Sequence, residues 1–167
     1  MFAQNTVCFS VEPNPINGIA FSGFTKYIDV LDCFFIVAEN SISDEKVLHA
    51  AAAAAELLDN NEDGIIDDPL VENRLQNQQA FIPIFSYEGS NAKNLLFDNY
   101  NGNGTSSVLY NNEMNPYRTG HWGSDATIEE VIHTINHVGH TYVYPNAFSL
   151  QPNSSLMSTA MDVARGG

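Results

Sequence analysis

A run of six alanines at residues 50–55 constrains the fold of this chain more than any other feature of its sequence. Alanine is the strongest helix former, and Ser43 is placed to cap a helix whose first turn contains Asp44 and Glu45. We therefore predict a helix over residues 46–58. Because alanine side chains are short, another element can approach this helix closely.

The segments around this helix predict the other elements of the fold. Residues 27–31 and 33–38 are rich in β-branched and aromatic side chains and too short for helices, which predicts two buried strands. Residues 81–85 predict an edge strand, because Pro83 has no N–H to donate to a sheet. Further predicted elements are helices at 71–79, 128–138 and 154–165, regular structure at 94–97 and 106–110, and an extended segment at 142–145. Few short strands near the N-terminus, packed with three to four helices, make an α+β fold.

Length and charge limit the functions open to the chain. Its 167 residues fit an irregular segment at 1–25 followed by a single α+β domain at 26–167. Because the last predicted helix ends so close to the C-terminus, we expect the natural chain to continue. A net charge of −14 argues against nucleic acid and anionic membranes as partners, and no apolar run is long enough to span a membrane.

The choice of polar residues and the two cysteines bear on location. Lysine is scarce and amides and hydroxyls carry most of the polarity, which favours an extracellular or periplasmic location. The first ten residues nevertheless contain no visible signal peptide. Cys8 and Cys33 are too few for a zinc ribbon, and they either form a disulfide in an oxidising compartment or remain two separate buried thiols.

An acidic loop follows the alanine-rich helix. Within residues 59–67, oxygen donors recur at the spacing of a calcium loop, and Gly64 stands at position 6, where such a loop turns sharply. The loop resembles those of EF-hand and dockerin-like proteins, and the resemblance implies a structural Ca²⁺ between two helices. The candidate calcium ligands are Asp59, Asn61, Asp63, Ile65 (through its carbonyl) and Asp67.

The end of the loop departs from that pattern. Position 12 is Leu70, where an EF-hand has a bidentate Glu, and Glu72 is a substitute only if the loop is longer. An acidic, solvated turn is the other interpretation. Seven acids and no base lie from Glu56 to Glu72, and so much unpaired charge favours a cation.

The helix predicted at 128–138, with Gly139 as its C-cap, gathers a second group of charged side chains. At about 100° per residue, one face is apolar and the opposite face carries two carboxylates and three imidazoles. The apolar residues are Ile128, Val131, Ile132, Ile135 and Val138, and the polar ones are Glu129, Glu130, His133, His137 and His140. The segment Glu129-Glu130-Val-Ile-His133 resembles the HExxH helix of zincin metallopeptidases, with the first His replaced by Glu.

The zincin resemblance implies a zinc hydrolase in which Glu129 and His133 hold Zn²⁺. Glu130 is then the general base that takes a proton from water. His133 and His137 form a rival pair of ligands. A straight helix separates Glu129 from His137 by about 12 Å, so these three residues cannot share one ion.

A third zinc ligand must come from another part of the chain. A later helix supplies an acid in gluzincins, which makes Asp162 the candidate by order, and His49 and His121 are further candidates. The alternative to a metal site is structural: Thr127 and Glu130 match a capping box at the helix start, and a polar helix face is often only solvated.

The chain also resembles, over residues 27–167, an uncharacterised zincin-like, metallopeptidase-related family that combines LDNNEDG-like, EExxH-like and MDxARGG-like segments.

These residues leave two hypotheses for the function of the chain. The first hypothesis is a zinc-dependent metallohydrolase, a peptidase acting on a peptide or protein, with a structural calcium loop. The second is a non-catalytic, calcium-stabilised extracellular binding domain with a degenerate metal site.

Overall fold

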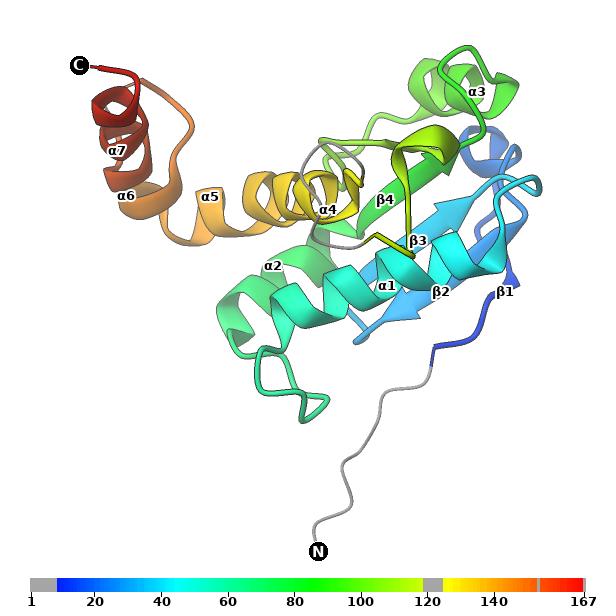
Figure 1. Ribbon diagram of the computed structural model, residues 1–167, viewed down its shortest axis with the longest axis horizontal. Coiled ribbons are helices and arrows are strands. Elements are labelled where there is room, and N and C mark those ends of the chain that lie inside the picture. Colours follow the sequence, from blue (N-terminus) through cyan, green and yellow to red (C-terminus); the bar gives the residue numbers. More distant parts are fainter. Residues whose placement is uncertain (1–8, 119–124, 153, 167) are drawn as a thin grey trace, which may run out of the picture.

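A mixed β-sheet forms the centre of the structure, a computed structural model that describes residues 9–118, 125–152 and 154–166 (Figure 1). Within these residues the sheet has five strands in the order β1-β2-β3-β4-β5. They are β1 (Glu12–Pro13), β2 (Lys26–Val30), β3 (Phe34–Ala38), β4 (Ala80–Phe85) and β5 (Leu109–Tyr110). β1, β2 and β3 are antiparallel neighbours, whereas β4 runs parallel to both β3 and β5.

Helices cover the two faces of the sheet. The described helices and helical turns are η1 (Ile19–Phe21), α1 (Asp44–Leu58), α2 (Pro69–Gln78), α3 (Asn91–Asn99), η2 (Asn111–Glu113), α4 (Thr127–Ile135), the π-helical turn η3 (Asn136–His140), α5 (Thr141–Val143), α6 (Pro145–Phe148) and α7 (Leu156–Ala164). α1, α2 and α4 share one core with Ile28 and Ile36 of the sheet. η1 and α3 lie on the opposite face, around Phe81 and Phe85. The predicted α+β class is confirmed, although the chain contains more helical elements than the three to four expected.

The strands test the sequence predictions directly. β2 and β3 form where predicted and are joined by a turn in which Leu31 and Asp32 have positive φ, 53° and 56°. The edge-strand prediction for residues 81–85 is wrong, because β4 lies between β3 and β5 and is buried throughout. The Phe81 N–H donates to Gly104 on the β5 side, so the nitrogen of Pro83 faces the same side, where β5 does not yet pair. The sheet therefore accommodates a proline in an interior strand.

The helical predictions succeed in the first half of the chain. α1 follows Ser43 and buries Ala50, Ala51 and Ala54 against the sheet, which the short alanine side chains permit. α2 matches the predicted second helix. Within the segment expected to be irregular, residues 1–25, the described part contributes β1 and η1.

The C-terminal region is more helical than the sequence suggests. The prediction that residues 142–145 are extended is wrong, because Tyr142 and Val143 belong to α5, Pro145 begins α6, and only Tyr144 between them is not helical. Pro145 is the first residue of α6, a position where its missing N–H costs no hydrogen bond. α7 packs against α6, and both lie away from the sheet (Figure 1). No helix in the described ranges combines the length and apolar character needed to cross a bilayer.

Candidate functional site

The acidic loop between α1 and α2 is held in shape by its own side chains. The two carboxylate oxygens of Asp59, a buried residue, accept the N–H groups of Asp63 at 3.3 Å and Gly64 at 2.7 Å. Asn61 and Asp63 each accept the N–H two residues ahead, at 3.0 and 2.9 Å, which makes two Asx turns. Gly64 has a φ of 83°, so the sharp turn predicted at position 6 of the loop is confirmed.

The second half of the loop joins α2. Asp67 accepts hydrogen bonds from the side chain and the backbone of Asn60, at 2.8 and 3.0 Å, and these bonds lower the pKa of Asp67. Ile66, at position 8, is buried in the core. Asp68 caps the start of α2, and Leu70, at position 12, is exposed on its first turn. The Asp67 carboxylate is thus kept ionised, while position 12 supplies no oxygen side chain.

The loop is strongly acidic but does not gather its carboxylates at one point. Within the described residues, none of the seven acids from Glu56 to Glu72 forms an ion pair. Over the same residues, no three His, Cys, Asp or Glu side chains lie close enough together to hold a metal ion. The candidate ligands Asp59, Asp63 and Asp67 therefore lie in one loop, but their carboxylates do not meet at one point.

α4 carries the EExxH segment and buries a different set of side chains from the predicted one. Val131 and Ile135 are buried, but Ile128 and Ile132 are 48% and 43% exposed, so the predicted apolar face is only partly correct. Thr134 contributes to the buried face instead.

The helix start also differs from the prediction. Ala126 is the N-cap, so the expected capping box between Thr127 and Glu130 is absent from α4. The hydroxyl of Thr127 donates instead to Asp125, at 2.7 Å. The same carboxylate accepts the backbone N–H groups of Asn115 and Thr127.

His49 completes this cluster from α1. Its Nε2 lies 2.7 Å from Oδ2 of Asp125, and both side chains are almost fully buried. Burial raises the pKa of Asp125, but the hydrogen bonds from Thr127, His49 and Asn115 outweigh it, and the net effect is a lowered pKa. His49 is therefore a structural partner of Asp125 and is not directed at the EExxH face.

A π-helical turn follows α4 and rotates the later side chains away from the regular helical wheel. The Thr141 N–H donates to the carbonyl of Asn136, five residues back. His140 is the last residue of this turn. Its ring packs 5.1 Å from that of Phe148, and burial lowers the pKa of His140 despite the nearby charge of Asp68.

Gly139 lies inside this turn rather than after the helix, so its predicted C-cap role is wrong. Helical structure continues through η3 into α5. A Cβ at Gly139 would lie 3.1 Å from Cγ1 of Val71 and 3.3 Å from Cδ2 of Leu75. The missing side chain therefore allows α2 to approach η3 closely.

The structure brings together two of the predicted zinc ligands. Oε1 of Glu129 lies 3.9 Å from Nε2 of His133, and the two side chains are 56% and 61% exposed. Tetrahedral zinc with bonds of about 2.0–2.2 Å places two ligand atoms about 3.3–3.5 Å apart, so these exposed side chains would have to approach slightly to share one ion. Asp162 lies on α7, which packs mainly against α6, while His121 lies outside the described residues.

An open groove runs beside α4 and η3. It has a volume of about 480 Å³ and is lined by Glu130, His133 and His137 together with Ser106, Ser107, Asn136 and Leu150. The predicted general base and both members of the rival His pair therefore face one solvent-filled space. Glu129 does not line it.

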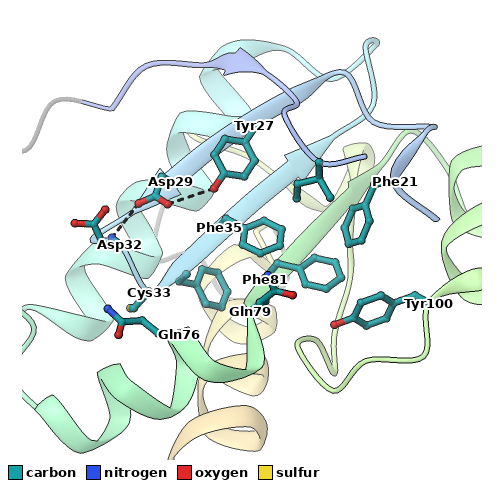
Figure 2. A pocket seen from close by; sticks show the side chains of 12 residues that line it. Phe21, Tyr27, Asp29, Asp32, Cys33, Phe35, Gln76, Gln79, Phe81 and Tyr100 are labelled. Carbon is teal, nitrogen blue, oxygen red and sulfur yellow. Dashed lines mark hydrogen bonds between the residues drawn. The ribbon is translucent and has the colours of Figure 1, made fainter. Parts of the chain in front are cut away.

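Sequence reasoning missed a second cavity, on the sheet face opposite α1 (Figure 2). Aromatic rings from β2, β3, β4 and the segment after α3 line it, and two aspartates of the β2–β3 hairpin stand at one end. The alternation of Tyr27 and Asp29 along β2 was the available signal, but it identifies a cavity only once the strand order is known.

Comparison with models of protein families, with curated proteins and with solved structures gives no match to this chain.

Proposed function

We propose that this chain is a calcium-stabilised binding domain in which residues 59–67 hold the ion. The observation that carries the proposal is Asp59, whose buried carboxylate receives two backbone N–H groups and closes the loop around itself. Hard oxygen donors on a turn between two helices are what Ca²⁺ requires. The ligands would be Asp59, Asn61, Asp63, the carbonyl of Ile65 and Asp67.

The charge of the loop supports a cation over a bare turn. The seven acids make no ion pair with the residues that the structure describes, so they repel one another, and a divalent ion would remove much of that repulsion. Asp63 and Asp67 are exposed at the loop surface, and Asp67 would exchange its hydrogen bonds from Asn60 for the ion. Because Leu70 supplies no ligand, we expect weak binding, with a Kd of about 10⁻⁴–10⁻³ M, the range of extracellular calcium modules.

Thermal unfolding in the presence and absence of Ca²⁺ tests this proposal. If Kd is about 10⁻⁴ M, 10 mM Ca²⁺ would add about 2.7 kcal/mol of stability and raise Tm by about 5–10 °C. Mg²⁺ at the same concentration should raise Tm much less, because it dehydrates reluctantly and demands octahedral geometry. An unchanged Tm at 10 mM Ca²⁺ would overturn the proposal.

Two matched variants locate the ion. Asp63→Asn keeps the Asx turn, because the amide oxygen still accepts the Ile65 N–H, but removes one charge from the loop. It should lose part of the calcium-dependent rise in Tm, because the loop loses a charge while the amide oxygen can still ligate the ion. Asp98→Asn makes the same chemical change on an exposed position of α3 and should keep the full rise.

A zinc-dependent hydrolase is the second candidate, supported by the groove that Glu130, His133 and His137 share. Zinc, when bound, supplies a Lewis acid that makes water more acidic. Glu130 would accept the proton of that water, while Glu129 and His133 would hold the ion and the groove would admit a peptide.

Measurements of metal content and of substituted variants test the zinc ligands and the general base of this second candidate separately. We expect about one zinc per chain after dialysis, and we expect Glu130→Gln to abolish peptide hydrolysis while zinc stays bound. Zinc lost on Glu129→Gln but kept on His137→Gln supports the first ligand pair, and the reverse supports the rival pair. Hydrolysis that survives Glu130→Gln would exclude Glu130 as the base.

A further inference from the structure

The strand register places the side chains that form the floor of the second cavity, which we call the aromatic cavity. Asp29 of β2 is opposite Phe35 of β3, and Phe35 is beside Phe81 of β4. Side chains in one such row share a face of the sheet, and Tyr27, two residues before Asp29, joins them. This face points away from α1, so the row is covered neither by that helix nor by its core.

The rings of the cavity form a continuous wall. Phe35 and Phe81 stack with their centroids 5.0 Å apart and their planes 7° apart. Tyr27 lies 5.6 Å from Phe35, and Tyr100 stands perpendicular to Phe81 at 5.2 Å. Tyr27, Phe35 and Tyr100 are only half-buried, so part of each ring is open to a ligand (Figure 2).

The charge at the end of this wall is negative and uncompensated. Asp29 accepts the Tyr27 hydroxyl at 3.2 Å and the backbone N–H of Asp32 at 2.9 Å, which holds its carboxylate at the cavity. Asp32 lines the same end, and none of the twelve described residues that line the cavity is Lys, Arg or His. Burial, followed by the charge of Asp29, raises the pKa of Tyr27 to about 12. The phenol therefore stays neutral and the aspartates provide the charge.

We infer that this cavity binds a small organic cation with a methylated or quaternary ammonium group, which lies against Tyr27 and Phe35 with Asp29 and Asp32 as its counter-ions. Aromatic faces attract such cations through the ring quadrupole, and a methylated ammonium is weakly hydrated and loses little on leaving water. The volume of about 270 Å³ suits a ligand of choline size and is below that of most drug-sized pockets.

This inference names a ligand for the binding domain proposed above, but the cavity and the calcium loop are separate sites. The experiment keeps them apart by measuring ligand binding in EDTA and again in Ca²⁺. Choline that binds in EDTA supports the cavity whatever the loop does, and a calcium-dependent Tm without choline binding supports the loop alone.

Calorimetric titration with choline and with 3,3-dimethyl-1-butanol is the deciding measurement. The two molecules have nearly the same shape, but carbon replaces the charged nitrogen in the second. We expect millimolar or tighter binding of choline and at least tenfold weaker binding of the neutral isostere. No heat of binding up to about 50 mM choline, or equal affinity for both molecules, would overturn the inference.

Substitutions then assign the contacts. Asp29→Asn and Phe35→Leu should each weaken choline binding by about three- to tenfold, the first by removing charge and the second by removing a ring from a half-buried position. Asp98→Asn, whose side chain does not line the cavity, should bind choline as the wild type does. Equal affinity for choline in all three variants, with unfolding curves that show them folded, would place the ligand elsewhere and reject this site.

Discussion

Nε2 of His49 lies 2.7 Å from Oδ2 of Asp125, although 76 residues separate them in the sequence. The pair joins the first turns of α1 to the start of α4. Because Asp125 also receives N–H groups from Asn115 and Thr127, one carboxylate fixes three separate segments of the chain.

Removing that carboxylate should destabilise the whole domain. We expect Asp125→Asn to lower the free energy of unfolding by about 2–4 kcal/mol, because buried donors lose their charged acceptor. Urea unfolding at pH 7 measures this loss. Asp98→Asn, the same change on the exposed side of α3, should stay within about 0.5 kcal/mol of wild type. Similar losses in both variants would contradict a structural role for the pair.

Two threonines on α4 should respond oppositely to the same substitution. Thr134 is buried, and its hydroxyl has no hydrogen-bond partner among the described residues. Thr134→Val removes that unsatisfied group at almost constant shape, so stability should rise by about 1 kcal/mol. Thr127→Val removes a hydroxyl that donates to Asp125 and should cost about 1–2 kcal/mol. The two unfolding midpoints, measured side by side, should move in opposite directions, and a shared direction would refute this assignment.

The close approach at Gly139 should make this position sensitive to size. Gly139→Val would press against Val71 and Leu75 and should cost about 1–3 kcal/mol. Gly139→Ala brings a contact of 3.1 Å but gains about 1 kcal/mol of helix propensity, so its effect should be much smaller. Thermal unfolding compares the two variants, and a valine that is tolerated as well as alanine would mean that α2 and η3 pack less closely than described.

His140 should make stability fall as the solution becomes mildly acidic. Burial lowers its pKa below the ordinary 6.5, so below pH 6.5 the unfolded chain binds more protons at this site than the folded chain. This contribution is complete above pH 6.5 and is lost as pH falls through the folded pKa. The lowered pKa values of Asp67, Asp68 and Asp125 act in a more acidic range.

The variant His140→Asn isolates this contribution. Between pH 7.5 and 5.5, the free energy of unfolding of the wild type should decrease more than that of the variant. Chemical denaturation at both pH values provides the comparison. Parallel decreases in the two proteins would show that His140 does not titrate differently in the folded state.

The sequence predicts best the features that depend on neighbouring residues. The alanine run and the turn at Gly64 act over a few residues and form where expected. Ser43 is the N-cap residue of α1, although its side chain makes no capping hydrogen bond. The loop around Asp59 could likewise be read from spacing alone, because its hydrogen bonds are all local.

The failures arise from contacts between distant segments. Pro83 indicates an edge strand until β5, a two-residue strand that the sequence barely marks, is placed beside β4. Gly139 resembles a cap until α2 is packed against it. The row of Asp29, Phe35 and Phe81 exists only through the pairing of three strands, so no window of sequence could reveal the aromatic cavity.

The edge strands of the sheet, β1 and β5, are each two residues long, and a proline lies near each of them. β1 contains Pro13, and at the other border Pro83 withholds an N–H where β5 has not yet begun. A second protein chain that adds to a sheet needs a continuous row of free backbone groups along one strand. In the described structure, such a chain could pair with only two residues of β1 or β5, because beyond them the exposed edge belongs to the next strand. This largely apolar sheet is thereby protected against edge-to-edge aggregation.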